Sequence, residues 1–154
     1  MKSYDSLHVF PEVSGALKSL ENNAAVDSYV FSNGTDKMVS ASIETSPDLS
    51  PHRSLFKALI TVEEVGAFKP AMSVYGDLVN KVGSAGSAGN VWVVSANPFD
   101  VVGARAAGLQ SAWIDRAGTG WVDRLGEVIG EIQPTIVVGG VDKAVAEILK
   151  QSSA

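Results

Sequence analysis

The chain has 154 residues, of which 45% are hydrophobic and 19% charged, and this composition indicates one globular domain with a sizeable core. Its formal net charge of -5 gives no basic footprint, so we expect no nucleic-acid partner. The absence of cysteine excludes disulfides and thiolate metal sites, and the presence of only two histidines excludes a histidine-rich metal centre.

The apolar segments are short and interrupted. The opening sequence MKSYDSLHVF lacks the apolar run of a secretory signal, and no stretch approaches the roughly 18 apolar residues of a membrane-spanning helix. Together with the lack of cysteine, this predicts a cytoplasmic protein without a membrane partner.

The first half of the chain alternates predicted helices with short strands. Proline in the first turn favours a helix start, and the apolar spacing after Pro11 is helical. The expected elements are a helix from Pro11 with Val13, Leu17 and Leu20 on one face, a strand at 28–32, a helix at 36–44, a helix from Ser50 and Pro51 with Leu55 and Leu59 inward, a strand at 59–65, and a helix from Pro70 that ends at Gly83.

The same alternation continues after the connector GSAGSAGN at 83–90, which we interpret as a flexible surface loop within the domain. The expected elements are a strand at 91–94, a helix capped by Asn97 and opened by Pro98 that ends at Gly108, a strand at 111–114, an ambiguous helix at 121–132, a strand at 135–138, and an amphipathic helix at 141–150. This order predicts a single domain over 1–154, with a parallel Rossmann-like α/β sheet covered by helices on both faces in three layers.

Polar or charged residues follow three of the predicted strands. They are Ser32 and Asn33, then Lys69, then Ser95, Asn97 and Asp100. The carboxyl ends of parallel strands meet at one edge of a sheet, where ligands bind. Taken alone, a polar residue at a strand end is more often a helix cap, and a lysine such as Lys69 is more often a solvated surface residue. In this order they predict an anion site in which Asp100 holds Lys69 in place.

These positions lie within segments that resemble the motifs of a known family. FSNGT, VGAFKPAMSVY, VVSANPFDVVGARAAGL and SAWIDR are similar to successive motifs of the haloacid dehalogenase superfamily, and within it to the L-2-haloacid dehalogenase type. The resemblance runs from about Tyr4 to about Arg116 and is faint beyond that point. It implies a core domain with the superfamily's Rossmann-like fold.

The resemblance also implies roles for the residues of the site. Ser32 and Asn33 would contact a substrate carboxylate or a developing oxyanion, and Lys69 would neutralise the nucleophile and the bound anion. The polar wall would be completed by Tyr75, Ser95 and Asn97, beside Phe99, which stands where the family often has tryptophan. Asp100 would orient Lys69 and a hydrolytic water. The dehalogenase type implies no metal and no cofactor, and the expected ligand is a small anionic or carbonyl compound.

One element of the family pattern has no counterpart in this sequence. The chemistry of the family begins from an aspartate at the end of a first strand, which attacks the substrate carbon to form an ester. The matched part of this chain begins after that strand and after nearly all of the helical cap, including its halide-binding arginine. In AWIDRAGTG, the residues Asp115, Gly118 and Thr119 have the spacing of the missing motif, but this segment already matches the strand that follows the fourth motif.

A sheet without its first strand has either two unpaired edges or a closed gap with new pairing. The segment SLHVF at 6–10 has strand character and is one candidate for the slot, and a partner chain is another. Exposed edges and apolar residues near the start of the chain also predict a homodimer. The residues expected at its interface are Tyr4, Leu7, Val9 and Phe10.

Three functional interpretations stay open on the sequence. The first is a repurposed enzyme that uses the remaining pocket on a small carboxylate or carbonyl substrate, without an aspartyl ester. The second is a non-catalytic binding or interaction protein whose motifs keep the fold. The third is a truncated relic of a 2-haloacid dehalogenase. In each of them, classical aspartyl-ester dehalogenation by this chain alone is not expected.

Overall fold

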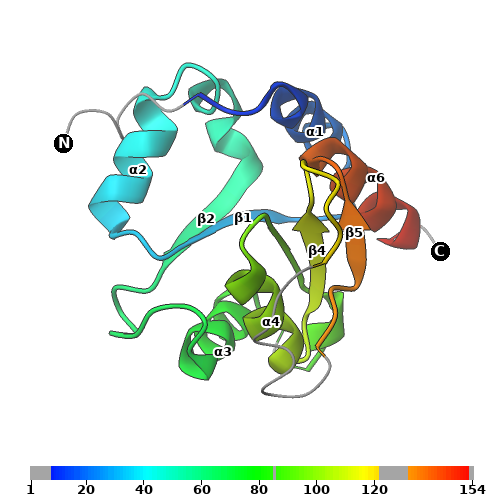
Figure 1. Ribbon diagram of the computed structural model, residues 1–154. Coiled ribbons are helices and arrows are strands. Elements are labelled where there is room, and N and C mark those ends of the chain that lie inside the picture. Colours follow the sequence, from blue (N-terminus) through cyan, green and yellow to red (C-terminus); the bar gives the residue numbers. More distant parts are fainter. Residues whose placement is uncertain (1–7, 85, 122–131, 153–154) are drawn as a thin grey trace.

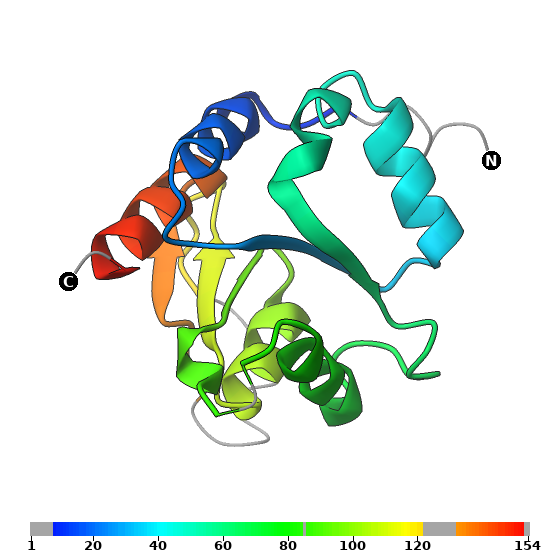
Figure 2. The ribbon, with the colours of Figure 1, turned by 180° about the vertical axis from the view of Figure 1, so that it is seen from behind.

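The chain folds into helices packed around two parallel β-sheets (Figures 1 and 2). The computed structural model describes residues 8–84, 86–121 and 132–152. Within these residues, no helix is long and apolar enough to cross a membrane. The predicted parallel α/β fold is confirmed.

The first sheet consists of β1 (Ser28–Ser32) and β2 (Phe56–Thr61), which run parallel with Ser32 opposite Thr61. Helix α2 (Asp36–Thr45) joins them, and its N-cap Thr35 accepts a hydrogen bond from the Met38 amide at 3.3 Å. Between α2 and β2 lies only a short 3-10 helix, η2 (Ser50–Leu55). The predicted helix with Leu55 and Leu59 inward is therefore wrong at Leu59, which pairs with Val30 of β1. The aromatic and β-branched residues that follow Leu55 favour the strand.

The second sheet has the order β3 (Trp92–Ser95), β4 (Gln110–Ile114) and β5 (Ile136–Val138), all parallel. Side chains alternate between its two faces. Val93 packs with the helices α3 (Met72–Lys81) and α4 (Pro98–Ala106), whereas Trp92 packs against α6 (Val141–Ser152). This sheet therefore has helices on both faces, as the sequence predicted.

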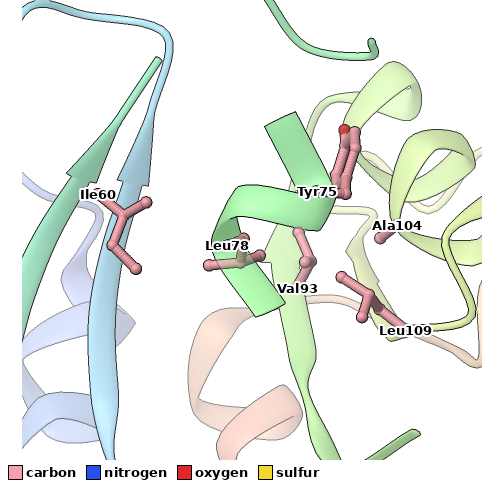
Figure 3. Close-up of a cluster of buried hydrophobic side chains, with 6 residues drawn as sticks. All are labelled: Ile60, Tyr75, Leu78, Val93, Ala104 and Leu109. Carbon is pink, nitrogen blue, oxygen red and sulfur yellow. The ribbon is translucent and has the colours of Figure 1, made fainter. Parts of the chain in front are cut away.

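The largest core cluster joins the two sheets through α3. Figure 3 shows Ile60 of β2 on one side, Val93 of β3 on the other, and Leu78 of α3 between them. On the far side of the molecule, α1 (Pro11–Glu21) lies beside α6 (Figures 1 and 2). Helix packing thus connects two sheets whose strands do not pair with each other within the described residues.

The start of the described chain does not enter either sheet. The backbone amide of Val9 and the ring of His8 both bond to the carboxylate of Asp48, at 3.0 Å each, and Phe10 is the N-cap of α1. The part of SLHVF that the structure describes, 8–10, is therefore not the missing strand. The ambiguous helix at 121–132 lies almost wholly outside the described residues.

The predicted connector at 83–90 contains a 3-10 turn, η3 (Ala88–Asn90), and Gly83 has a positive φ of 71°. That backbone conformation is easily adopted only by glycine, so Gly83 ends the turn after α3 as predicted. Gly108 has the same role after α4, with φ of 79°.

Candidate functional site

The carboxyl ends of β1 and β3 meet at one buried lysine. Lys69 lies in the segment between β2 and α3, and its Nζ is 2.9 Å from Oδ1 of Asp100 in the first turn of α4. The two side chains are only 7% and 5% exposed. A buried ion pair needs further hydrogen bonds to offset its desolvation, and the surrounding strand ends provide them.

The lysine ammonium has a second partner on β1. Its Nζ donates to the backbone carbonyl of Phe31 at 3.3 Å and lies 4.4 Å from the centroid of the Phe31 ring. The carbonyl and the π-face both favour a cation at this position. The motif comparison of the sequence did not assign a role to Phe31. In the sequence, Phe31 is distinguished only as an aromatic residue immediately before the polar end of the strand.

The carboxylate of Asp100 is held from β3. Ser95 Oγ donates to Asp100 Oδ2 at 2.7 Å and accepts a hydrogen bond from the Asn97 amide at 3.0 Å. Ser95 therefore joins the end of β3 to the first turn of α4. Asn97 occupies the N-cap position, but its side chain makes no capping hydrogen bond, unlike the cap that the sequence predicted.

The two predicted polar residues after β1 also have defined partners. Asn33 Oδ1 accepts a hydrogen bond from the backbone amide of Lys69 at 2.9 Å, and Ser32 Oγ accepts one from the amide of Gly34 at 3.0 Å. Asn33 thus fixes the backbone of the lysine segment, and Ser32 shapes the turn after the strand. The hydroxyl proton of Ser32 remains a possible donor to a ligand.

Tyr75 contacts the start of α4 from the core, through the backbone of Phe99 and Asp100. Tyr75 is fully buried in the core, and its hydroxyl donates to the backbone carbonyls of Phe99 and Asp100 at 3.5 and 3.4 Å. Burial, and secondarily the charge of Asp100, raise the pKa of Tyr75 well above its ordinary value of 10.0. Tyr75 therefore holds the first turn of α4 from within the core.

A groove extends from this ion pair along the space between the two sheets. Its volume is about 780 Å³, and Lys69 and Asp100 are part of its lining. Residues of both neighbouring strands, such as Phe31 of β1 and Val93 of β3, also line it. Of the eight predicted site residues, Lys69 and Asp100 line the groove. Four others lie at the strand ends and act through hydrogen bonds: Ser32, Asn33, Ser95 and Asn97.

Asp115, the alternative aspartate considered from the sequence, organises its own loop. Its carboxylate accepts hydrogen bonds from the backbone amides of Thr119 at 3.2 Å and Gly120 at 2.8 Å. It follows β4 and is not among the residues that line the groove. No cluster of three or more potential metal ligands occurs within 8–84, 86–121 and 132–152.

The geometry defines an α/β protein with parallel strands and a buried lysine–carboxylate centre at their carboxyl ends. Its sequence relatives are haloacetate and haloacid dehalogenases, its structural relatives include L-2-haloacid dehalogenases, and the chain belongs to the haloacid dehalogenase superfamily.

The sequence relatives include haloacetate dehalogenase H-2 of Moraxella sp. (strain B), which is 34% identical over 129 residues. That match covers 82% of this chain and 53% of the relative. (S)-2-haloacid dehalogenase 2 of Pseudomonas sp. (strain CBS-3) is 29% identical over 140 residues, which are 91% of this chain and 56% of the relative. No family model matches the chain.

The solved structures similar to this one include the L-2-haloacid dehalogenase RSc1362, with a TM-score of 0.81 and 22% identity. The match covers 96% of this chain and 60% of that one. The L-2-haloacid dehalogenase of Xanthobacter autotrophicus matches with a TM-score of 0.74, covering 96% of this chain and 64% of its own. The chain thus spans about half the length of its sequence relatives.

Proposed function

We propose that this chain binds a small carboxylate or carbonyl compound at Lys69, and that it is a repurposed enzyme which polarises that ligand. The observation that supports this proposal is the ammonium group of Lys69. A lysine ammonium has three donors; that of Lys69 donates to the Phe31 carbonyl and forms an ion pair with Asp100 Oδ1. Within the described residues it makes no other hydrogen bond or ion pair, which leaves a third donor for a ligand.

A ligand oxygen at that third donor would be stabilised strongly. The low dielectric around a buried cation strengthens its interaction with an anion or with a developing oxyanion. Asp100 keeps the lysine in position, and the Ser32 hydroxyl adjoins the end of β1 as a second candidate donor. This arrangement suits lyase, isomerase or acid–base chemistry on a small carbonyl compound.

We do not propose that this chain alone hydrolyses 2-haloacids through an aspartyl-ester intermediate. Asp100 is committed to Lys69 and Ser95, and Asp115 to its loop amides. Each of these two carboxylates therefore has a structural role within the chain.

The second candidate is a non-catalytic binding protein. The hydrogen bonds of Asn33, Ser95 and Tyr75 to other parts of the chain favour it, because each of them stabilises the fold without any ligand. Both candidates predict binding of a small carboxylate, and only the first predicts turnover.

The test is a titration of the chain with 2-chloropropionate and with pyruvate, followed by amide chemical shifts in NMR spectra and by product analysis. The comparison variants are Lys69→Met and, as a matched control, Lys57→Met, which removes an exposed lysine 3.4 Å from Asp27. Carboxylate binding that is lost in Lys69→Met and kept in Lys57→Met is expected. Equal binding by both variants would refute the site, and binding without conversion of any tested carbonyl compound would favour the non-catalytic candidate.

A further inference from the structure

We propose that Asn33 is a site of spontaneous covalent modification, in which the backbone nitrogen of Gly34 attacks the side-chain amide of Asn33. The succinimide that forms opens with water to isoaspartate or aspartate, and this conversion disables the anion site at Lys69. The chemical step depends only on the residues around Asn33, whereas its consequence for binding rests on the carboxylate site proposed above.

The first observation is the pair of residues itself. Asn33 is followed by glycine, and the sequence contains no other Asn–Gly pair. An asparagine side chain reaches the next backbone nitrogen with the geometry needed to close a succinimide ring. A side chain on the following residue hinders that approach, and glycine has none. Asn33 is therefore the asparagine of this chain whose neighbour hinders the reaction least.

The second observation is the position of the pair in the fold. Asn33 and Gly34 lie between Ser32, which ends β1, and Thr35, which is the N-cap of α2. They form a bend outside both elements, and both are half-buried. Ring closure needs a rotation of the backbone that the hydrogen bonds of a helix or a strand resist. The bend allows this rotation, and its partial exposure admits the water that opens the ring.

The third observation is a hydrogen bond to the carbonyl group that is attacked. Asn33 Oδ1 accepts a hydrogen bond from the backbone amide of Lys69 at 2.9 Å. Attack at Cγ places negative charge on this oxygen, and a fixed N–H donor stabilises such a charge. Asn33 makes no other side-chain hydrogen bond among the described residues, so its leaving nitrogen is not held in place.

Ser32 restrains the other reacting group. The amide of Gly34 donates to Ser32 Oγ at 3.0 Å, in a turn where a hydroxyl bonds the amide two residues further on. The nitrogen of Gly34 has to lose this proton to form the new bond, and the hydrogen bond stabilises the protonated amide. Ser32 therefore slows the modification, and removal of its hydroxyl frees the attacking nitrogen.

The reaction needs water as its only co-reactant. A bond forms between the Gly34 nitrogen and Asn33 Cγ, the bond from Cγ to Nδ2 breaks, and ammonia leaves with the proton of Gly34. Water then adds to one of the two ring carbonyls, and the bond from that carbonyl to nitrogen breaks. Opening at the backbone carbonyl gives isoaspartate, and opening at Cγ gives aspartate. Both products carry a carboxylate in place of the neutral amide.

Either product changes the surroundings of Lys69. Aspartate at residue 33 adds a negative charge in contact with the lysine segment, and this charge repels a carboxylate ligand. Isoaspartate adds a methylene group to the main chain and shifts the turn. The turn has little free space, since a Cβ on Gly34 would lie 3.2 Å from Val39 Cγ2 and 3.3 Å from Ser32 Oγ. The longer main chain therefore displaces Asn33 Oδ1 from the Lys69 amide.

The experiment incubates the full chain in mildly alkaline buffer prepared with isotopically labelled water. Trypsin then releases Asn33 in the peptide 19–37, which also contains Asn22 and Asn23 as internal references. Mass spectrometry with electron-based fragmentation locates the labelled oxygen and separates isoaspartate from aspartate. The variants are Ser32→Ala, Ser32→Thr, which keeps a hydroxyl, and Ser28→Ala, which removes an equally half-buried serine at the other end of β1.

We expect Asn33 to convert at least threefold faster than Asn23, with isoaspartate among the products. Ser32→Ala should accelerate the conversion at least threefold, whereas Ser32→Thr and Ser28→Ala should keep the wild-type rate. Circular dichroism confirms that the variants are folded. Conversion of Asn23 before Asn33, or conversion of Asn33 to aspartate alone, would overturn the proposed reaction. Equal rates in Ser32→Ala and the wild-type chain would overturn the role of Ser32.

The consequence for binding is measured on the converted chain, which ion exchange separates by its added negative charge. We expect the converted chain to bind 2-chloropropionate at least tenfold more weakly than the unconverted chain. Equal affinities would show that the modification does not control the Lys69 site. If the unconverted chain binds no carboxylate, the proposed function fails, while the measured conversion of Asn33 still supports the modification.

Discussion

Gly103 of α4 faces the phenol ring of Tyr75 so closely that a Cβ atom at residue 103 would lie 2.3 Å from the tyrosine hydroxyl oxygen. Two ring carbons would be 2.4 Å away. Tyr75 is fully buried, so it cannot move aside without displacing the core around it (Figure 3). The close approach of α3 and α4, and with it the position of Asp100, depends on the absence of a side chain at residue 103.

Gly103→Ala is therefore expected to destabilise the fold. With a contact of 2.3 Å to a buried ring, we expect an overpacking cost in the upper part of the usual range of about 1–3 kcal/mol, above the gain of about 0.5–1 kcal/mol from replacing a helical glycine by alanine. Urea denaturation measures the free energy of unfolding. The matched control is Gly76→Ala in α3, where a Cβ would meet nothing within 4 Å. That variant should be more stable by about 0.5–1 kcal/mol. Stabilisation by both variants would contradict the packing described here.

Replacing Lys69 by methionine is expected to cost stability as well as ligand binding. The change leaves Asp100 buried without its counter-ion, and breaking a buried pair in this way costs about 3–5 kcal/mol. The measurement is again the free energy of unfolding. Adding Asp100→Asn to Lys69→Met removes the orphaned charge and should recover a large part of the loss. If the double variant is no more stable than Lys69→Met alone, the loss of unfolding free energy in Lys69→Met is not caused by the unpaired charge of Asp100.

The fold class followed from the sequence because its signals are local. Strands such as 28–32 are short apolar runs, and prolines at positions 11 and 98 mark helix starts that the structure reproduces. The helix from Ser50 illustrates what a local signal misses. Ser50 and Pro51 do begin a 3-10 helix, but the pairing of Leu59 with Val30, far away in the chain, turns the following residues into a strand. No local pattern records such a pairing.

The site was predicted in part for the same reason. The pairing of Lys69 with Asp100 follows from two polar strand ends at one sheet edge, and the structure has it at 2.9 Å. The role of Phe31 depends on its backbone carbonyl, which any residue provides, so the sequence holds no specific signal for it. The burial of Tyr75 depends on the packing of α3 against α4, which the spacing of the motif does not encode.

The buried phenol of Tyr75 predicts a loss of stability in alkaline solution. Burial raises its pKa in the folded chain, whereas the unfolded chain has the ordinary value of 10.0. As the pH rises through 10, the unfolded state loses this proton while the folded state keeps it. The free energy of unfolding then falls by up to about 1.4 kcal/mol per pH unit, and it is fully retained below that pH.

Tyr75→Phe removes this titration and leaves every other ionisable group in place. Its hydroxyl hydrogen bonds are long, at 3.4 and 3.5 Å, so their loss costs only about 0.5–1.5 kcal/mol at neutral pH. Urea denaturation of both proteins between about pH 8 and pH 11 should show a steeper decline for the wild-type chain. Parallel declines would mean that the phenol ionises equally in both states.

The last prediction concerns self-association, which we propose occurs as a homodimer through the surface around Phe10. Phe10 is 57% exposed, and the guanidinium of Arg116 lies 3.8 Å from its ring centroid. Arg116 is itself held by Glu12, with Nη2 2.7 Å from Oε1, so the Phe10 ring packs on a side chain that is fixed in position. An aromatic side chain that is held rigidly and left exposed is the kind of group that anchors an interface, since little conformational entropy is lost on binding.

A two-fold interface would bury both copies of this patch, and a stable one buries about 1,200–2,000 Å² in total. Sedimentation at micromolar concentration should therefore give twice the chain mass of 16.1 kDa. Phe10→Asp should shift it to the monomer, because a carboxylate would replace the apolar anchor. Met38→Asp, at an exposed position on α2, adds the same charge elsewhere and should leave the dimer intact. A wild-type chain that sediments as a single species of one chain mass would disprove the dimer, and a dimer insensitive to Phe10→Asp would place its interface on another surface.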